Sequence, residues 1–253
     1  MKKIYISLLA ALLLTAGLSG NALSQDSKAL ASAVVSATDR SPEDRALDAG
    51  RKPAELLAFI GVQPGWRIAD LGAGGGYTTE LLKRAVGKDG VVYGQNSKKL
   101  LEMFLEKPWS ARLEKPVNKG VLRLDRDFDD PFPSDMRPLD AVTMVLFYHD
   151  TVWLGVNREA MNKAVFNALK PGGVFVIVDH SARPGDGVEV ANTFHRIEES
   201  VVKSEVQAAG FVLDGQADFL RNKDDTRDWN DSPRAAGERR GTSDRFALRF
   251  RKP

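Results

Sequence analysis

The glycine-rich stretch IADLGAGGGYTTELL, residues 68–82, constrains the fold of this chain more than any other feature. An apolar run ends at Asp70, and a helical pattern begins shortly afterwards. Between them stand four glycines: Gly72, Gly74, Gly75 and Gly76. Glycine lets a loop approach a ligand closely and adopt positive φ, and the first N–H groups of a helix lack partners within the helix. The stretch therefore predicts a ligand-binding loop between a buried strand and a helix, at the carboxyl end of the strand.

Short apolar runs alternate with helical patterns along the rest of the chain. The expected strands are WRIADLG (66–72), GVVYGQN (90–96), GVLRLD (120–125), LDAVTMVLFY (139–148), GVFVIVDH (173–180), FVLDGQADFL (211–220) and DRFALRFRKP (244–253). The expected helices between them are TTELLKRAV (78–86), SKKLLEMFLE (97–106), NREAMNKAVFNAL (157–169) and RIEESVVKSEVQAAG (196–210). This alternation predicts a doubly wound α/β sheet covered on both faces, in a single domain.

The ends of the chain predict further organisation. Residues 1–24 have a basic start, an apolar stretch and small residues after it, which is the layout of a secretory signal cleaved near Ala22 or Ser24. The body is therefore expected to be periplasmic or secreted. Residues 25–40 are interpreted as a polar linker, 41–60 as two helices, and 222–243 as a polar loop or lid. The domain proper is expected over residues 41–253.

Charge and composition exclude several classes of function. The formal net charge is +2, and the two lysines of residues 1–24 account for it, so the chain from Gln25 onward sums to 2 − 2 = 0. A neutral body gives no basis for nucleic-acid binding, and membrane contact is expected only through the signal. The chain has no cysteine, which excludes disulfides, thiol catalysis and a lipidated cysteine. Nothing in the sequence predicts the oligomeric state.

The spacing of the glycines decides between classes of nucleotide loop. A dinucleotide fingerprint reads G-x-G-x-x-G, but its last position falls on Tyr77 when counted from Gly72 and on Thr79 when counted from Gly74. No Gly-Lys-Ser/Thr follows, so a P-loop is excluded.

The ordered set of motifs resembles the class I S-adenosylmethionine (SAM) methyltransferases. The glycine stretch resembles the first motif of that family, LDAVTMVLFYHD (139–150) its fourth-strand motif, and ALKPGGVFVIVDH (168–180) its fifth-strand block. The two closing strands resemble its late hairpin, in which the last strand runs antiparallel. RKPAELLAFIGVQPG (51–65), HRIEESVVKSEVQAAGF (195–211) and the RFALRFRKP end resemble, more narrowly, a group of bacterial exported predicted methyltransferases. The resemblance implies a Rossmann-like, seven-stranded sheet and SAM as the cofactor.

By the same resemblance, several residues are expected at the cofactor. Asp70 would orient the amino-acid end of SAM, and the loop backbone would pass beneath it. Asn96 aligns with the acid that holds the ribose in the family, so SAM binding is expected to be weaker by about 1–2 kcal/mol. Asp125 or Asp127 would accept from the adenine amino group. The expected loop and pocket residues are Gly72, Ala73, Gly74, Gly76 and Tyr77, with Tyr148 also a candidate for the pocket.

Three histidines, His149, His180 and His195, are all expected at the carboxyl edge of the sheet, with His195 opening a helix. Each is a candidate general base because imidazole titrates near neutral pH, and each is also a candidate for a structural hydrogen bond. Asp150, Asp179 and His180 could instead hold a divalent cation. Trp229 is a candidate for closing over an acceptor. Charged residues before the glycine stretch form either an N-terminal lid or a solvated face: Arg45, Asp48, Arg51 and Lys52.

The leading hypothesis is a SAM-dependent methyltransferase that acts on an unknown small molecule or envelope component. The first alternative is a non-catalytic periplasmic binding protein on the same fold, because Asn96 stands where an acid is expected and SAM is made in the cytoplasm. A nicotinamide oxidoreductase is a third alternative, disfavoured by the glycine spacing.

Overall fold

The structure is a computed structural model that describes residues 27–136 and 138–253. The expected signal at residues 1–24 lies outside the described residues. Within the described part of the chain, no helix has both the length and the apolar character needed to cross a membrane.

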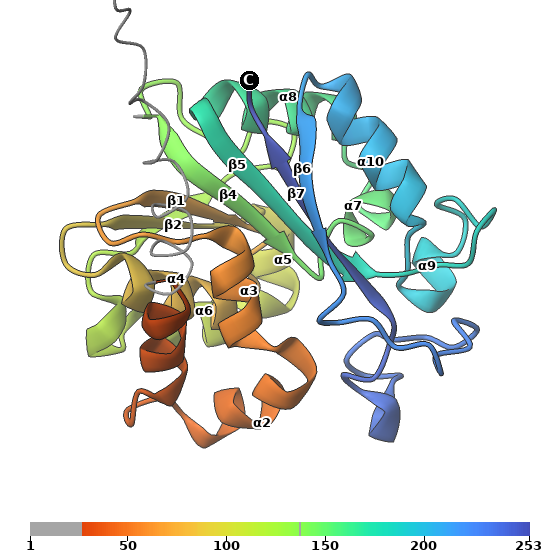
Figure 1. Cartoon of the computed structure of the whole chain (residues 1–253), viewed down its shortest axis with the longest axis horizontal. Coiled ribbons are helices and arrows are strands. Elements are labelled where there is room, and N and C mark those ends of the chain that lie inside the picture. Colours follow the sequence, from red (N-terminus) through yellow and green to blue (C-terminus); the bar gives the residue numbers. More distant parts are fainter. Residues whose placement is uncertain (1–26, 137) are drawn as a thin grey trace, which may run out of the picture.

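A seven-stranded sheet forms the centre of the molecule (Figure 1). Its strand order is β3-β2-β1-β4-β5-β7-β6. The strands are β1 (Arg67–Leu71), β2 (Val91–Asn96), β3 (Leu122–Asp125), β4 (Leu139–Val145), β5 (Leu169–His180), β6 (Val212–Ala217) and β7 (Arg245–Arg251). Strands β1 to β5 are paired in parallel, and β7 pairs antiparallel with both β5 and β6. The expected doubly wound sheet with an antiparallel last strand is confirmed.

Alternate residues of the central strands pack into two cores. Ala141 contributes to one core, whereas Val142 and Met144 contribute to the other, because successive strand side chains point to opposite faces. The first core packs α3 (Pro53–Ile60) and α4 (Tyr77–Val86) against the sheet. The second packs α5 (Lys98–Leu100), α8 (Arg158–Ala168) and α10 (Glu199–Ala208) against the opposite face. The sheet is therefore buried on both sides, as parallel sheets require.

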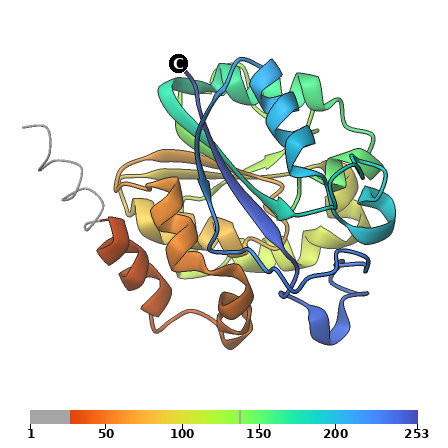
Figure 2. The ribbon, with the colours of Figure 1, turned by 45° about the vertical axis from the view of Figure 1, so that its right-hand side comes forward.

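The segment before the domain is helical and not the linker that its polar composition predicted. Residues 27–36 form a helix, and Ala31 and Val34 on it are buried in the same core as α3 and α4. Figure 2 shows this segment, in red, beside the orange α3. Alanine and serine dominate this segment and contribute little hydrophobicity, so a helix that buries only a few apolar side chains resembles a linker in sequence.

The two expected helices of residues 41–60 are confirmed as α2 (Pro42–Arg51) and α3. Ser41 caps α2, because its hydroxyl accepts from the backbone N–H of Asp44, and Pro42 occupies the first turn. Lys52, at φ +47°, joins α2 to α3 through a left-handed turn. The turn directs α2 across the carboxyl end of the sheet, where Gly50 lies beside Gly241.

Other elements differ in detail from the sequence-based expectation. The helix expected at 97–106 is α5, a π-helical turn η1 (Leu101–Leu105) and α6 (Glu106–Leu113) in succession. The helix expected at 196–210 begins only at Glu199. Short helical pieces complete the fold: η2 (Pro116–Asn118), α7 (Asp150–Trp153), α9 (Ala191–Phe194) and η3 (Gly237–Arg239).

Candidate functional site

Two adjoining cavities lie at the carboxyl ends of β1, β4 and β5. The first has a volume of about 260 Å³ and is lined by the glycine loop and Asp70. The second has a volume of about 370 Å³ and is lined by all three histidines of the chain. Leu47, Arg51 and Leu146 line both cavities, so they form the wall between them. We call the first the loop cavity and the second the histidine cavity.

The glycine loop makes close contacts that a side chain would prevent. Gly72 and Gly76 both have positive φ, at +71° and +80°. A Cβ atom at Gly72 would lie 2.6 Å from the ring of Phe147, and one at Gly76 would lie 2.7 Å from Trp109. The backbone therefore lies flat between these aromatic rings and the cavity, which is the arrangement that the four glycines predicted.

Asp70 is held in place by two threonines. Its carboxylate accepts hydrogen bonds from the hydroxyls of Thr79 on α4, at 2.6 Å, and Thr143 on β4, at 2.9 Å. The register of the sheet provides the second partner, because Asp70 pairs with Thr143 across β1 and β4. Burial raises the pKa of Asp70 to about 6, although both hydroxyls favour the ionised form. The side chain also lines the loop cavity, so it is a preorganised carboxylate at the end of β1.

Asn96 lines neither cavity, and its expected contact with a ribose stays a prediction. The side chain is completely buried, and its amide bonds only Gly74: Oδ1 accepts from the backbone N–H at 2.9 Å and Nδ2 donates to the carbonyl at 3.1 Å. Its neighbour Gln95 acts similarly, accepting from the N–H of Gly72 at 3.1 Å. Both amides fasten the glycine loop to the end of β2. Asn96 uses both the acceptor and the donor of its amide on the loop, and a carboxylate would have no donor to offer.

The two candidate adenine contacts also lie away from the loop cavity. Asp125 is paired with Arg123 at 2.7 Å. Asp127 lines a separate hollow of about 180 Å³ together with Phe128. The ring of Phe128 stacks on that of Phe147, which lines the loop cavity, with centroids 4.9 Å apart. This stacked pair therefore joins the linings of the two hollows.

Arg51 and Tyr77 form the side of the loop cavity opposite the strands. The guanidinium of Arg51 lies over the Tyr77 ring, 4.5 Å from its centroid, and the Tyr77 hydroxyl donates to Asp48 at 2.6 Å. Burial lowers the pKa of Arg51, but a guanidinium stays charged at neutral pH. The sequence placed Asp48 and Arg51 in a lid or on a solvated face. The structure places Arg51 at both cavities, whereas Arg45, Asp48 and Lys52 line neither of them. Asp48 lies behind Tyr77, where it pairs with Arg40 at 2.6 Å.

His149 is fixed by Asp179 at the ends of β4 and β5. The Asp179 carboxylate lies 2.7 Å from the Nδ1 atom of His149 and accepts from its backbone N–H, also at 2.7 Å. Burial by itself would lower the pKa of His149, but the carboxylates of Asp179 and Asp150 outweigh it and raise the pKa to about 10. The two carboxylates therefore favour the protonated form of this imidazole.

The other two histidines meet His149 in the same cavity. His195 does not open a helix as expected; it ends α9 in a left-handed conformation, at φ +52°. Its Nδ1 atom lies 3.2 Å from the Nε2 atom of His149. His180 packs its ring against that of His149, and its Nδ1 atom lies 2.8 Å from Ser243 Oγ and 2.5 Å from Asp231. Burial lowers the pKa of His180, and Asp231 opposes this shift only in part.

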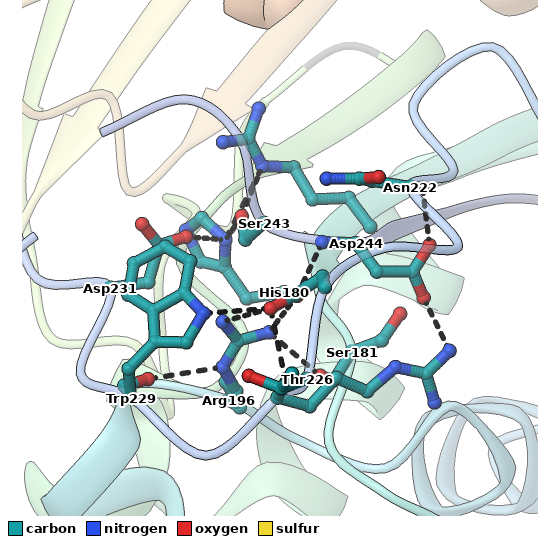
Figure 3. A network of polar contacts seen from close by, with 12 residues as sticks. His180, Ser181, Arg196, Asn222, Thr226, Trp229, Asp231, Ser243 and Asp244 are labelled. Carbon is teal, nitrogen blue, oxygen red and sulfur yellow. Dashed lines mark hydrogen bonds and ion pairs between the residues drawn. The ribbon is translucent and has the colours of Figure 1, made fainter. Parts of the chain in front are cut away.

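The segment 222–243 forms part of the cavity wall and is held by a buried network (Figure 3). Asp225 is paired with Arg196 at 2.7 Å, and neither side chain is exposed. The same carboxylate accepts from Trp229 Nε1 at 2.8 Å and from the backbone N–H of Asp244 at 2.6 Å. Trp229 lies over Arg196 and lines no described cavity, so this geometry does not support closure over an acceptor.

Some site residues were missed in sequence. Gln95 and Asp231 carry no motif, and Thr79 and Thr143 resemble ordinary helix and strand residues. Only their positions could have indicated a role at the site: Thr143 lies on the strand beside β1, and Gln95 directly precedes Asn96. Tyr148 was expected in the pocket but is buried, where its hydroxyl donates to Glu205 at 2.7 Å.

Comparisons with known proteins define the fold. No protein-family model matches the chain, and no curated protein matches it in sequence. The structure is similar to a SAM-dependent methyltransferase from Aquifex aeolicus, with a TM-score of 0.59 at 17% identity, over 84% of this chain and 94% of that one. It is also similar to a chain of the complex between the Haloferax volcanii Trm112 methyltransferase activator and a putative methyltransferase, with a TM-score of 0.58 at 19% identity, over 88% and 97%.

A third similar structure is described as the [4+2]-cyclase SpnF, with a TM-score of 0.53 at 16% identity, over 83% of this chain and 80% of that one. The architecture is thus the fold of solved SAM-dependent methyltransferases. At these identities the likeness establishes the fold alone, and the reaction has to be argued from the site.

Proposed function

We propose that this chain binds SAM in the loop cavity and transfers the methyl group to an acceptor in the histidine cavity. The observation that carries the proposal is the pair of adjoining cavities. One is lined by a preorganised glycine loop and carboxylate, the other by the three histidines together with apolar side chains, and Leu47, Arg51 and Leu146 separate them. Methyl transfer requires a donor and an acceptor held in line, and much of its catalysis can come from such positioning.

The charges of the loop cavity fit the amino-acid end of SAM. Asp70 offers a carboxylate for the ammonium group, and Arg51 offers a guanidinium for the carboxylate group. The backbone of Gly72 lies against the ring of Phe147, and both residues line the same cavity. When bound, SAM supplies an electrophilic methyl group. The chain binds and orients it, and the wall side chains shield the sulfonium from water.

Isothermal titration of the purified protein with SAM tests the binding step. We expect saturable binding that is at least tenfold weaker in Asp70→Asn, because that change removes the charge and keeps the shape. NADH serves as the competing probe for an oxidoreductase. Absence of heat and of a thermal shift at millimolar SAM, or tighter binding of NADH than of SAM, would contradict the proposal.

The second candidate is a binding protein that has kept the fold without turnover. The observation in its favour is that β2 ends in Gln95 and Asn96, whose amides fasten the loop and leave no carboxylate there for a ribose. Transfer of a labelled methyl group from SAM to any component of an envelope extract would exclude this candidate. Saturable SAM binding without transfer to any fraction would support it.

The location and the acceptor are also part of the proposal. The layout of residues 1–24 supports export to the periplasm or beyond, with an acceptor that is a small molecule or an envelope component. The volume of the histidine cavity, about 370 Å³, suits a small molecule or one end of a larger one. Cell fractionation with an antibody against the folded domain tests the location, and recovery from the cytoplasm alone would overturn it.

A further inference from the structure

We propose that His149, Asp150 and His195 form a binding site for one divalent first-row transition-metal ion. This proposal is independent of methyl transfer and can fail or succeed without it. Three ligand atoms converge on one point of the histidine cavity: His149 Nε2, Asp150 Oδ1 and His195 Nδ1. The metal set expected from sequence was different, consisting of Asp150, Asp179 and His180.

The three ligand atoms form a nearly equilateral triangle. His149 Nε2 lies 3.1 Å from Asp150 Oδ1, His195 Nδ1 lies 3.2 Å from the same oxygen, and the two nitrogens are 3.2 Å apart. With metal–ligand bonds of about 2.1–2.2 Å, such a triangle corresponds to ligand–metal–ligand angles of about 95°. That is one face of an octahedron. Two imidazoles and one carboxylate on a face form the facial triad that transition metals occupy.

The surroundings of His149 support ligation through Nε2. A metal-binding histidine usually donates its other ring N–H to a carboxylate, which fixes the tautomer and orients the ring. Asp179 is completely buried and lies 2.7 Å from Nδ1 of His149, so it accepts that proton and directs the Nε2 lone pair into the triangle. Asp179 therefore orients the first ligand, which is a different role from the direct ligation that its sequence position indicated.

The other two ligands are also held in place. Trp153 donates its indole N–H to Asp150 Oδ1 at 2.6 Å, which fixes the carboxylate. His195 adopts positive φ, a conformation that non-glycine residues adopt rarely and that often marks functional sites. This turn after α9 brings its ring to 5.2 Å from the ring of His149. The carboxylates of Asp150, in the triangle, and Asp179, behind His149, together match the charge of a divalent cation.

His180 does not belong to the site. Its Nδ1 atom is directed to Ser243 and Asp231, on the segment 222–243. It nevertheless lines the same cavity and packs against His149. It is thus a matched control, because its replacement removes a buried imidazole from the cavity without removing a ligand.

The test is titration of the purified, chelator-treated protein with Co²⁺, without SAM. We expect one Co²⁺ per chain, a rise in melting temperature, and the weak visible absorption of a six-coordinate ion. His195→Asn should lower Co²⁺ affinity at least a hundredfold; asparagine tolerates the left-handed conformation, so the turn is kept. Asp179→Asn should lower it about 10–100-fold, as expected for the loss of an orienting carboxylate. His180→Asn should change it less than threefold.

Two results would overturn the site. One is the absence of stoichiometric Co²⁺ binding by the unaltered protein. The other is equal Co²⁺ affinity in the unaltered protein and in His195→Asn, with both variants folded by circular dichroism. The cluster would then be a hydrogen-bonded group of carboxylates and imidazoles that acts through its own protons.

Discussion

The side-chain amide of Asn96 holds the glycine loop in place. Replacing it with aspartate is therefore expected to destabilise the loop, whereas the alignment with a ribose-binding acid would predict tighter SAM binding. The Nδ2 atom of Asn96 donates to the Gly74 carbonyl at 3.1 Å, and a carboxylate oxygen there would face that carbonyl with no proton between them. We expect Asn96→Asp to lower the free energy of unfolding by about 2–3 kcal/mol and to weaken SAM binding, as measured by urea unfolding and titration calorimetry. Acidification should reduce the defect, since a protonated carboxyl regains a donor.

Asn230 supplies the control for that prediction. Its amide donates to the Thr193 carbonyl at 2.8 Å in an exposed setting, so Asn230→Asp should cost less than about 0.5 kcal/mol. Tighter SAM binding by Asn96→Asp would show that position 96 does face the ribose and that the loop geometry differs from the one described.

Arg51 is expected to recognise the carboxylate of the amino-acid end of SAM. Arg51→Met keeps much of the side-chain stem and removes the charge, and we expect SAM affinity to fall about 10–100-fold because a charge-assisted bond is lost. Affinity for adenosine, which lacks the amino-acid end, should stay unchanged in the same calorimetric assay. Arg45→Met is the control, since Arg45 is on the same helix but lines neither cavity. An equal loss for adenosine would mean that Arg51 acts only on the fold.

Single residues show where sequence reasoning reaches its limit. Asp70 and the glycines were recognisable because strand, acid and loop are contiguous, so their local order determines their geometry. Asn96 was placed near the loop correctly, but its role depends on which way a buried amide points. The metal triangle joins residues 149, 150 and 195, and its third member depends on a left-handed turn that no spacing rule predicts.

The segment 222–243 was expected to be a polar loop or a lid because it is long and polar, and a buried ion pair holds it in place. Asp225 accepts from four partners at once: Arg196, Trp229 and the backbone N–H groups of Arg227 and Asp244. We expect Asp225→Ala to cost about 3–5 kcal/mol, because it leaves the buried guanidinium of Arg196 without its counter-charge. Urea unfolding measures the cost, and limited proteolysis should show new cleavage within 222–243.

Asp228→Ala is the matched control on the same segment. Asp228 pairs with Arg183 at 3.0 Å, but both side chains are about half exposed, so Asp228→Ala should lower the stability far less than Asp225→Ala. Equal stability losses in the two variants would contradict the claim that burial makes the Asp225 network decisive.

Elements were predictable to the extent that hydrophobic periodicity determines them. The seven strands were expected because each is an apolar run between polar turns, and α2 and α3 because Ser41, Pro42 and Pro53 mark their starts. The helix over residues 27–36 was missed because it is rich in alanine and serine and buries few apolar side chains. The expected 196–210 helix begins late, at Glu199, because Ile197 instead pairs with Ser181 as a β-bridge, a contact distant in sequence.

At the scale of the whole molecule, the sheet order brings the cofactor loop and the histidines to one edge. The ends of β1, β4 and β5 are neighbours only because β4 returns to pair with β1 on the side opposite β2. In a doubly wound sheet the direction of strand order reverses between β1 and β4, so the loops that follow these two strands diverge there. The two cavities are therefore a consequence of topology, whereas the identity of the acceptor depends on side chains that topology does not determine.

Asp70 links the stability of the whole fold to ligand binding and to pH. Its pKa is raised from 3.8 to about 6, so between these values the folded state binds more protons than the unfolded state. The free energy of unfolding therefore falls as pH rises from about 4 to about 6, by up to about 3 kcal/mol. Asp70→Asn removes this contribution, so it should stabilise the protein relative to the unaltered chain at pH 7 and lose that advantage near pH 4. Urea unfolding across this range measures the difference.

The same proton competes with SAM. Because ionised Asp70 is needed to hold the ammonium group, SAM affinity should be constant above about pH 7 and fall about tenfold for each pH unit below about 6. In Asp70→Asn the affinity should be low and without this dependence. If SAM affinity depends on pH in the same way in both proteins, Asp70 does not contact the ligand. If the two dependences diverge while the free energy of unfolding changes in the opposite sense, the carboxylate of Asp70 lowers stability and is kept because it binds SAM.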